Sequence, residues 1–263
     1  MQNTAFSNKV VVVTGAAAGI GKSIAGAFID VGARVLLVDY NAELLATTCA
    51  ELNTEQAVGL VADMSTAPQV QADIVQQAVR QFGGLDILVN NAGVYPSKMA
   101  LDISVADWDN IFDLNVRGYF FMAQQAAKYM QAHGAGGNII NISSTAAITA
   151  RPGVSHYCAT KAAIKMLTQV LALEWAKYNI RVNSVAPGLI ETEALLASLQ
   201  TSEAQAEHKE KLSYCPLERA GLGSEIAAAV LFMADNSKAA FITGQVLFVD
   251  GGYTAGKLYK TKK

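Results

Sequence analysis

A chain of 263 residues, 52% of them hydrophobic, is long enough to bury a generous core in one large domain or two small ones. Its formal net charge of −2 provides no broad basic field, so we expect no nucleic acid partner. No apolar run approaches the roughly 18 residues of a membrane span. The first residues, MQNTAFSNK, also lack the basic start and apolar stretch of a secretory signal. We therefore expect no membrane partner.

The cysteines and histidines are few and scattered. The three cysteines are widely spaced, odd in number and without a CxxC pair, which argues against a disulfide framework and a zinc site. This usage is typical of a reducing compartment, so we expect a cytoplasmic protein. The three histidines share no metal-ligand spacing, and no metal site is predicted.

Short β-branched runs recur along the chain and predict seven strands. They lie at 10–14, 35–39, 58–61, 87–90, 139–142, 182–185 and 246–249. Between them lie stretches of helical periodicity, for example after Gly19, from Pro68 and from Asp107. Continuous apolar strands that alternate with helices are expected where both faces of a parallel sheet are covered. The pattern predicts a doubly wound, Rossmann-like α/β fold of three layers, α/β/α, in a single domain spanning 1–263.

The first predicted strand leads into a glycine-rich turn, TGAAAGIG, followed by the start of a helix. Gly15, Gly19 and Gly21 have no Cβ atoms, which permits a tight turn and a close approach of the backbone to a ligand. The helix N-terminus then offers free N–H groups and a positive dipole end to a pyrophosphate. The turn therefore predicts a dinucleotide-binding site, although any strand-to-helix turn can use glycines.

Asp39 ends the second predicted strand and indicates which dinucleotide binds. A carboxylate there can accept both hydroxyls of the adenosine ribose and would repel a 2′-phosphate. Positions 16–18 and 40–41 hold no Arg or Lys to receive such a phosphate, so NAD is predicted and NADP is less favoured. The alternative is that Asp39 only ends or caps the strand. After the third strand, Asp63 and Met64 are predicted to edge the adenine, with an ordinary helix N-cap as the alternative for Asp63.

Tyr157 and Lys161 lie four residues apart on a predicted helix and therefore share one of its faces. A free tyrosine has a pKa near 10, and lowering it to near neutrality requires about 4 kcal/mol of preferential stabilisation of the phenolate. The neighbouring ammonium and a cationic nicotinamide ring, partly shielded from water, could supply that stabilisation. The phenol would then suit general acid–base work on an alcohol or a carbonyl.

For several residues around this pair, the sequence leaves more than one role open. The fifth strand ends in Ser143 and Ser144, candidate donors to a developing oxyanion, and only one of them should face the cleft because side chains alternate along a strand. His156 lies about 100° around the helix from Tyr157. A packing or substrate-edge role is therefore favoured over a second base. Cys158 is predicted to be a small core residue.

A long segment, 189–223, interrupts the alternation of strands and helices. It is too long for a structureless connection, so we expect one or two short helices forming a mobile substrate flap. In an open α/β sheet, ligands sit beyond the carboxyl ends of the strands, and this segment leaves from that edge. The end of the chain, 254–263, is predicted to be a tail whose basic cluster is solvated or contacts another subunit rather than binding an anion.

Seven ordered motifs carry a resemblance to a known family. They are TGAAAGIG at 14–21, NNAG at 90–93, DLN at 113–115, ISS at 142–144, YCATK at 157–161, NSVAPG at 183–188 and ITGQVLFVDGG at 242–252. On these motifs the chain resembles the short-chain dehydrogenase/reductase family, in its compact single-domain branch, over essentially its whole length. The resemblance implies an NAD-dependent oxidoreductase that moves a hydride between the nicotinamide and a secondary alcohol or ketone.

The resemblance also implies a catalytic tetrad. Family members place the serine 13 positions before the tyrosine, which selects Ser144 here. Tyr157 is then the general acid or base, and Lys161 binds the nicotinamide ribose and lowers the pKa of the phenol. Asn115 holds a water that continues the proton relay, with bonds to neighbouring backbone as the alternative.

Further positions are implied at the cofactor. Asn91 should lie near the ribose, whereas Asn90 is more readily a structural residue that joins adjacent strands. The remaining implied contacts, in the glycine turn, in NNAG and at the nicotinamide end, are Ile20, Gly93, Gly188, Ile190 and Thr192. The family usually forms homotetramers, and we expect one here.

The substrate is the least defined part of the prediction. Pocket residues should follow the strand ends, among them Tyr95 and Arg151, and for Arg151 a place at the rim is favoured over pairing with a carboxylate. Sugars or polyols, cyclic alcohols, steroid-like molecules and hydroxyacyl compounds stay open. Alternatives for the whole protein are a 3-oxoacyl-carrier-protein reductase and a non-catalytic dinucleotide-sensing subunit.

Overall fold

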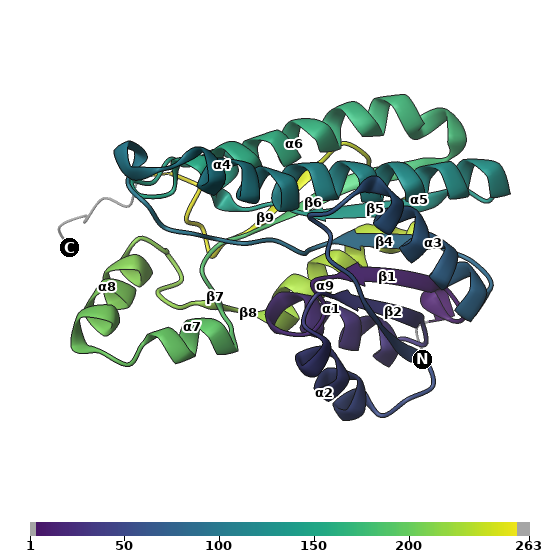
Figure 1. Ribbon diagram of the computed structural model, residues 1–263, viewed down its shortest axis with the longest axis horizontal. Coiled ribbons are helices and arrows are strands. Elements are labelled where there is room, and N and C mark those ends of the chain that lie inside the picture. Colours follow the sequence, from purple (N-terminus) through teal and green to yellow (C-terminus); the bar gives the residue numbers. More distant parts are fainter. Residues whose placement is uncertain (1–3, 257–263) are drawn as a thin grey trace.

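The computed structural model describes residues 4–256, and its centre is a seven-stranded parallel sheet in the order β3-β2-β1-β4-β5-β6-β9 (Figure 1). The strands are β1 Val10–Thr14, β2 Arg34–Asp39, β3 Ala57–Val61, β4 Ile87–Asn90, β5 Gly137–Ile142, β6 Ile180–Pro187 and β9 Val246–Val249. Three of the predicted strands have the bounds expected, and the other four are one to four residues longer. The doubly wound prediction is confirmed.

Helices cover both faces of the sheet (Figure 1). One face carries α1 Gly19–Asp30, α2 Ala42–Leu52 and α9 Gly223–Ala234. The other carries α3 Pro68–Phe82, α5 Tyr119–His133 and α6 Ser155–Trp175. Shorter helices are η1 Thr4–Phe6, η2 Ala100–Asp102, α4 Val105–Phe112, η4 Thr145–Ala147, η5 Ala176–Tyr178 and α10 Asn236–Ala239.

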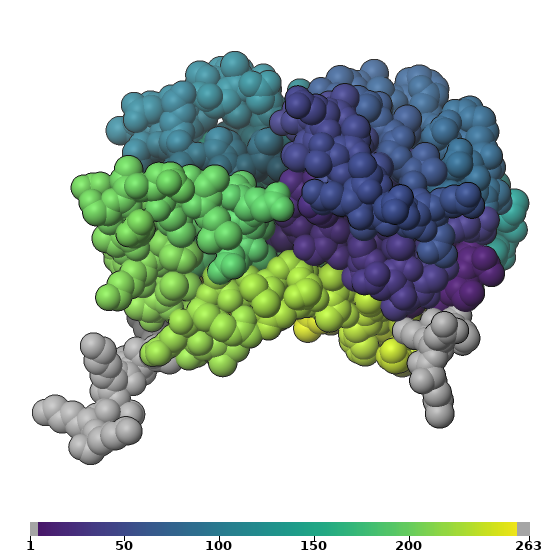
Figure 2. All heavy atoms as spheres, turned by 90° about the horizontal axis from the view of Figure 1, so that it is seen from below, coloured from purple at the N-terminus to yellow at the C-terminus, as the bar shows by residue number. Residues whose placement is uncertain are grey.

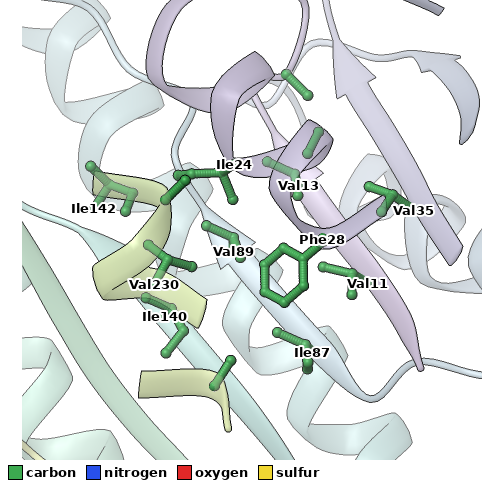
Figure 3. Close-up of a cluster of buried hydrophobic side chains, with 14 of the residues drawn as sticks. Val11, Val13, Ile24, Phe28, Val35, Ile87, Val89, Ile140, Ile142 and Val230 are labelled. Atoms are coloured by element: carbon green, nitrogen blue, oxygen red, sulfur yellow. The ribbon is translucent and has the colours of Figure 1, made fainter. Parts of the chain in front are cut away.

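Each strand contributes side chains to two apolar clusters, because successive side chains point to opposite faces. In β1, Val11 and Val13 pack with α1 and α9, whereas Val10 and Val12 pack with α3 and α5. Figure 3 shows the first cluster, in which Phe28 of α1 lies beside Val11 of β1, and Val230 of α9 is a member of the same cluster. This double burial is the reason why the strands read as unbroken apolar runs.

The helical stretch expected from Asp107 differs from a regular helix. It begins earlier, at α4, and a π-helical turn, η3 Asp113–Gly118, separates α4 from α5. A Cβ atom on Gly118 would lie 2.7 Å from the carbonyl oxygen of Met64, so the turn packs directly on the loop after β3. The π-helical turn had no signal in the apolar periodicity.

The segment 189–223 contains two short helices, as expected: α7 Glu193–Ser198 and α8 Ser202–Ser213. A small parallel pair, β7 Ile190–Glu191 and β8 Gly221–Leu222, joins the beginning and the end of the segment. In Figure 2 the segment (green) forms a lobe at one end of the molecule. That the lobe moves stays a prediction.

Two further observations concern membrane spans and metal sites in the described part of the chain. Within residues 4–256, no helix combines the length and the apolar character that a bilayer crossing needs. The same part of the chain holds no group of three or more His, Cys, Asp or Glu side chains placed to bind a metal ion. Of the predicted tail 254–263, residues 257–263 lie outside the described part.

Candidate active site

The glycine turn between β1 and α1 is shaped by close backbone contacts. Gly15 and Gly19 have φ angles of +63° and +54°, in the left-handed region that side chains with a Cβ rarely adopt. A Cβ atom on Gly21 would collide with the carbonyl oxygen of Gly15. The turn thus forms a cradle that only glycines leave open, in front of the N-terminus of α1. Such a cradle fits the pyrophosphate of a dinucleotide.

Asn91 braces this turn from the end of the neighbouring strand β4. Its side-chain amide donates to the carbonyl oxygens of Thr14 and Gly15, both at 2.9 Å, and its backbone N–H donates to the Thr14 hydroxyl at 3.0 Å. Both side-chain donors are therefore used inside the protein, and the expected contact with the ribose stays a prediction. Asn90, by contrast, donates to Asn141 Oδ1 at 3.1 Å and so joins β4 to β5, as expected.

Asp39 lies at the end of β2 with its carboxylate directed at the glycine turn. One oxygen accepts from the Ala17 N–H at 3.0 Å, and the other accepts from the Asn41 N–H at 3.0 Å. The carboxylate is half-buried, and each of its oxygens keeps a second acceptor site for a ribose hydroxyl. The residues at this end of the sheet therefore fit an adenosine ribose.

The loop after β3 places Asp63 and Met64 differently. Asp63 accepts from the N–H and the hydroxyl of Ser65, at 2.9 and 2.7 Å, and α3 begins only at Pro68. The N-cap alternative for Asp63 is therefore wrong, because its bonds close a local turn instead of capping the helix. The Met64 side chain is buried in the core, so a contact with adenine would have to come from its backbone.

Ser144, Tyr157 and Lys161 meet where β5 and α6 come together. The Ser144 hydroxyl interacts with the Tyr157 phenol, and it also accepts from the Ala146 N–H at 3.1 Å. The Ser143 hydroxyl instead donates to the backbone carbonyl of Lys161 at 3.2 Å. Of the two serines, Ser144 is therefore the one beside the phenol.

Lys161 lies one turn after Tyr157 on α6 and is only 4% exposed. Its ammonium donates to the carbonyl oxygen of Ile142 at 2.9 Å and lies 5.7 Å from the centroid of the Tyr157 ring. Burial lowers the pKa of Lys161 from its ordinary value of 10.5 to about 8. The other two N–H donors of this ammonium have no hydrogen-bond partner among residues 4–256.

Tyr119 is a neighbour of Lys161 that the sequence analysis missed. Its ring centroid lies 5.3 Å from the ammonium, close enough for a cation–π contact, and its hydroxyl donates to the same Ile142 carbonyl at 3.2 Å. Burial raises the pKa of Tyr119, so the hydroxyl stays protonated. No sequence signal pairs Tyr119 with Lys161, because they lie on different helices, α5 and α6.

The protonation of Tyr157 differs from what its spacing to Lys161 suggests. Burial raises the pKa of Tyr157 above its ordinary value, and this effect outweighs the hydrogen bond from Ser144 and the charge of Arg151, which both lower it. Tyr95 and Cys158 raise it further. The surrounding side chains therefore do not by themselves bring the pKa of Tyr157 near neutrality. This corrects the part of our prediction that assigned the lowering of this pKa to the ammonium of Lys161.

Asn115 lies in the π-helical turn and is completely buried. Its side chain makes a two-way bond with the backbone of Val94, accepting from N–H at 2.9 Å and donating to the carbonyl at 3.0 Å. It also donates to the Thr160 hydroxyl at 3.3 Å. Asn115 thus fastens the loop after β4 to α6, and its expected hold on a water stays a prediction.

The predicted nicotinamide end lies at the root of the segment 189–223. Gly188 donates its N–H to the Val249 carbonyl at 3.0 Å, and Ile190 is almost buried in β7. Thr192 caps α7, and its Cγ2 would lie 3.5 Å from a Cβ on Gly19. The root of the segment therefore reaches the phosphate cradle.

The other two expected cofactor contacts flank these groups. Ile20 is half-buried in the first turn of α1 and packs against the core. A Cβ on Gly93 would lie 3.0 Å from Asn115 Oδ1, so the chain passes Asn115 closely there. Their contacts with a cofactor stay predictions.

A cavity of about 970 Å³ opens beside the phenol, between the segment 189–223, the loop after β9 and the residues that precede α6. Tyr95 and Arg151 both line it. The Tyr95 ring lies edge-on to the Tyr157 ring with 4.6 Å between centroids, so one wall of the cavity contacts Tyr157. Its size suits a small organic substrate next to a nicotinamide ring.

His156 and Cys158 flank Tyr157 on α6, and their burial bears on the roles that the sequence predicted for them. His156 is completely buried, and neither ring nitrogen has a hydrogen-bond partner among residues 4–256, which favours packing over a second base. Cys158 is half-buried rather than a core residue, so that prediction is wrong. It belongs to neither of the two apolar clusters, and the buried residues of α6 are at other positions of the helix.

A glycine cradle at the first strand, an acidic end to the second, and a serine, tyrosine and lysine that meet where β5 and α6 come together define a nicotinamide-dependent oxidoreductase. A family model described as enoyl-(acyl carrier protein) reductase matches residues 15–254. The chain belongs to the short-chain dehydrogenase/reductase family. It is an oxidoreductase that acts on CH–OH groups.

Three similar proteins illustrate the range of the family. An NAD-dependent glycerol dehydrogenase from Listeria innocua is 40% identical over 249 residues, which are 95% of either chain. A D-threitol dehydrogenase from Mycolicibacterium smegmatis is 39% identical and covers 95% of this chain and 94% of its own. The crystal structure of a short-chain type dehydrogenase/reductase from Mycobacterium marinum superposes with a TM-score of 0.88 at 34% identity, covering 95% and 97% of the two chains.

Proposed function

We propose that the protein oxidises a secondary hydroxyl group of a small polyhydroxylated substrate with NAD, reversibly, and that Tyr157 is the general acid and base. The observation that carries this proposal is the position of the Tyr157 phenol, next to Ser144 and edge-on to Tyr95, a residue that lines the cavity. The substrate class is supported by the relatives, whose names specify glycerol and D-threitol. It is also supported by the polar and charged side chains of the cavity.

In the direction of oxidation, the phenolate of Tyr157 takes the proton of the substrate hydroxyl. The bound nicotinamide supplies the hydride acceptor for the carbon that carries this hydroxyl. Ser144 donates a hydrogen bond to the same oxygen and stabilises the charge that develops on it. Lys161 has two N–H donors left for ribose hydroxyls, and its positive charge favours the phenolate.

The preference for NAD follows from Asp39. Its carboxylate can accept from both ribose hydroxyls, whereas a 2′-phosphate would bring two negative groups together with no cation at positions 16–18 or 40–41. We expect Asp39→Ala to lower kcat/KM with NAD by at least tenfold and to shift the NAD/NADP ratio towards NADP. Initial rates with both cofactors measure this ratio. An unchanged ratio would remove the basis for the preference.

The assignment of Tyr157 is tested with Tyr157→Phe, which removes the hydroxyl and keeps the ring. We expect turnover to fall by at least a thousandfold while NAD still binds, because the proton acceptor is lost and the cofactor cradle is untouched. Absorbance of the reduced nicotinamide reports turnover, and calorimetry reports binding. Turnover that survives the substitution would show that another group accepts the proton.

Two other functions have distinct signatures in the same assays. A 3-oxoacyl-carrier-protein reductase is favoured by a relative of that name from Thermotoga maritima, which is 36% identical, and it would show faster NADPH oxidation with a 3-oxoacyl thioester than NAD reduction with any polyol. A non-catalytic sensor would bind NAD and turn over no alcohol. We favour oxidation of a polyhydroxylated alcohol because Asp39 opposes NADPH.

We also propose a homotetramer in the cytoplasm. The assembly is supported by apolar side chains exposed on α6 and near the end of α10, among them Met166 (59%), Leu173 (83%) and Phe241. The location is supported by three cysteines that are all free. Light scattering tests the assembly, and the mass of a single chain would contradict it. Fractionation of the producing cells tests the location.

A further inference from the structure

The cavity beside Tyr157 is lined by seven charged side chains, and within residues 4–256 six of them have a polar partner. Lys211 pairs with Glu207 at 2.6 Å, and Arg219 pairs with Glu225 at 2.6 Å. The remaining two partnered groups are acidic. Glu210 accepts from the Tyr214 hydroxyl at 2.7 Å, and Asp250 accepts from the backbone of Gly252 and from Thr254.

Arg151 is the seventh, and it has neither an ion pair nor a hydrogen bond to any of residues 4–256. Its Nε is shielded from solvent and unpartnered. The guanidinium carbon lies 5.6 Å from the centroid of the Tyr95 ring, a cation–π contact that orients the group but uses none of its N–H donors. A shielded donor without an acceptor costs free energy, so this arrangement serves a ligand rather than the stability of the fold.

Arg151 is also close to the reaction. The Tyr95 ring that it covers lies edge-on to the Tyr157 ring, and the positive charge of Arg151 acts on the phenol. A substrate whose hydroxyl group reaches Tyr157 would therefore place its other end, a few bonds away, at the guanidinium.

We propose that Arg151 binds a carboxylate of the substrate, so that the preferred substrate is a small polyhydroxylated acid rather than a neutral polyol. A planar guanidinium matches a carboxylate with two parallel hydrogen bonds. A phosphate dianion fits less well, because Glu207, Glu210 and Asp250 line the same cavity and Arg151 is the one lining cation without a partner among residues 4–256. The oxidation converts the hydroxy acid to an oxo acid: a hydride goes to the nicotinamide, a proton goes to Tyr157, and the carboxylate is unchanged. This inference rests on the proposed function.

The experiment compares substrates of one carbon skeleton that differ at one end: a polyol, the acid with a terminal carboxylate, and the phosphate ester. With the unaltered enzyme we expect kcat/KM for the acid to exceed that for the polyol by at least tenfold. Arg151→Gln should raise KM for the acid by about 10- to 100-fold and change KM for the polyol less than twofold. Arg151→Lys should restore part of the effect, because it keeps the charge and loses the two-pronged geometry.

A matched control is Lys211→Gln, which removes another cation of the cavity that already has a partner. We expect it to change KM for the acid less than twofold, and retained NAD binding in each variant shows that the fold is intact. The proposal is overturned if Arg151→Gln affects the acid and the polyol equally, or if the polyol or the phosphate ester is the better substrate. Failure of the proposed function looks different: no member of the series would then be oxidised by any variant.

Discussion

Lys161, to which we assign a role in the proposed reaction, opposes the stability of the fold. Its ammonium is buried with one carbonyl as hydrogen-bond partner, and its pKa is lowered from 10.5 to about 8. Between these two pH values the unfolded chain binds more protons than the folded one, so this residue makes the protein more stable as pH rises through that window. Below pH 8 the buried charge costs about 3 kcal/mol relative to a neutral lysine.

We therefore expect Lys161→Met to abolish turnover and yet to raise the free energy of unfolding at pH 7, by up to about 3 kcal/mol. The advantage should shrink as pH approaches 10, where the unaltered lysine is neutral in the folded protein. Urea unfolding at pH 7 and at pH 10 measures both values. Lys165→Met, one turn further along α6 and only partly buried, is the control and should change stability by less than about 0.5 kcal/mol. A destabilised Lys161→Met, or a difference that does not depend on pH, would contradict this account.

At this scale the sequence predicted pairs that are close in the chain better than pairs that are distant. The spacing of Tyr157 and Lys161 places them on one face of a helix without further information. The contact of Lys161 with Tyr119, and the bonds of Asn115 to Val94, depend on how α5, α6 and the loop after β4 pack, which local spacing does not contain. The raised pKa of Tyr157 was missed for the same reason, because burial depends on the whole fold.

Among the elements, α1 contains three glycines, and substitution of two of them, Gly21 and Gly26, has opposite expected effects. Gly21 faces the turn, where a Cβ would collide with the Gly15 carbonyl, whereas a Cβ on Gly26 would lie 3.8 Å from Leu52 in an ordinary contact. Gly26→Ala should therefore stabilise the protein by about 0.5–1 kcal/mol, because alanine favours the helix. Gly21→Ala should destabilise it by about 1–3 kcal/mol and weaken NAD binding, because the turn must shift.

Thermal unfolding and calorimetric titration with NAD measure these two variants side by side. Because both replace glycine with alanine in one helix, the comparison separates the shape of the cradle from helix propensity. Effects of equal sign on stability, or unchanged NAD binding in Gly21→Ala, would show that the cradle tolerates a side chain.

The elements themselves were largely predictable. Strands buried on both faces give unbroken β-branched runs, which is why all seven were found and three with the same bounds. The π-helical turn at Asp113–Gly118 was not predictable, since it packs through Gly118 on the Met64 carbonyl, a contact between distant parts of the chain.

For the whole molecule, the order of elements was enough to predict the sheet and the edge where the site lies, because parallel strands bring their carboxyl ends to one side. The cavity was predictable only in outline. Its walls come from the residues before α6, the segment 189–223 and the loop after β9, and the absence of a partner for Arg151 within the described chain emerges only when all three are in place.

The packing of α9 has a consequence for how the protein is made. Val230 completes the same apolar cluster as Val11 and Phe28, so the cradle for the dinucleotide rests on a helix that is synthesised long after β1 and α1 (Figure 3). Until residue 234 has emerged, one side of the earliest strand and helix has no cover of its own. The nascent chain therefore presents an apolar surface while residues 31–222 are synthesised, and chaperones can bind there during that interval.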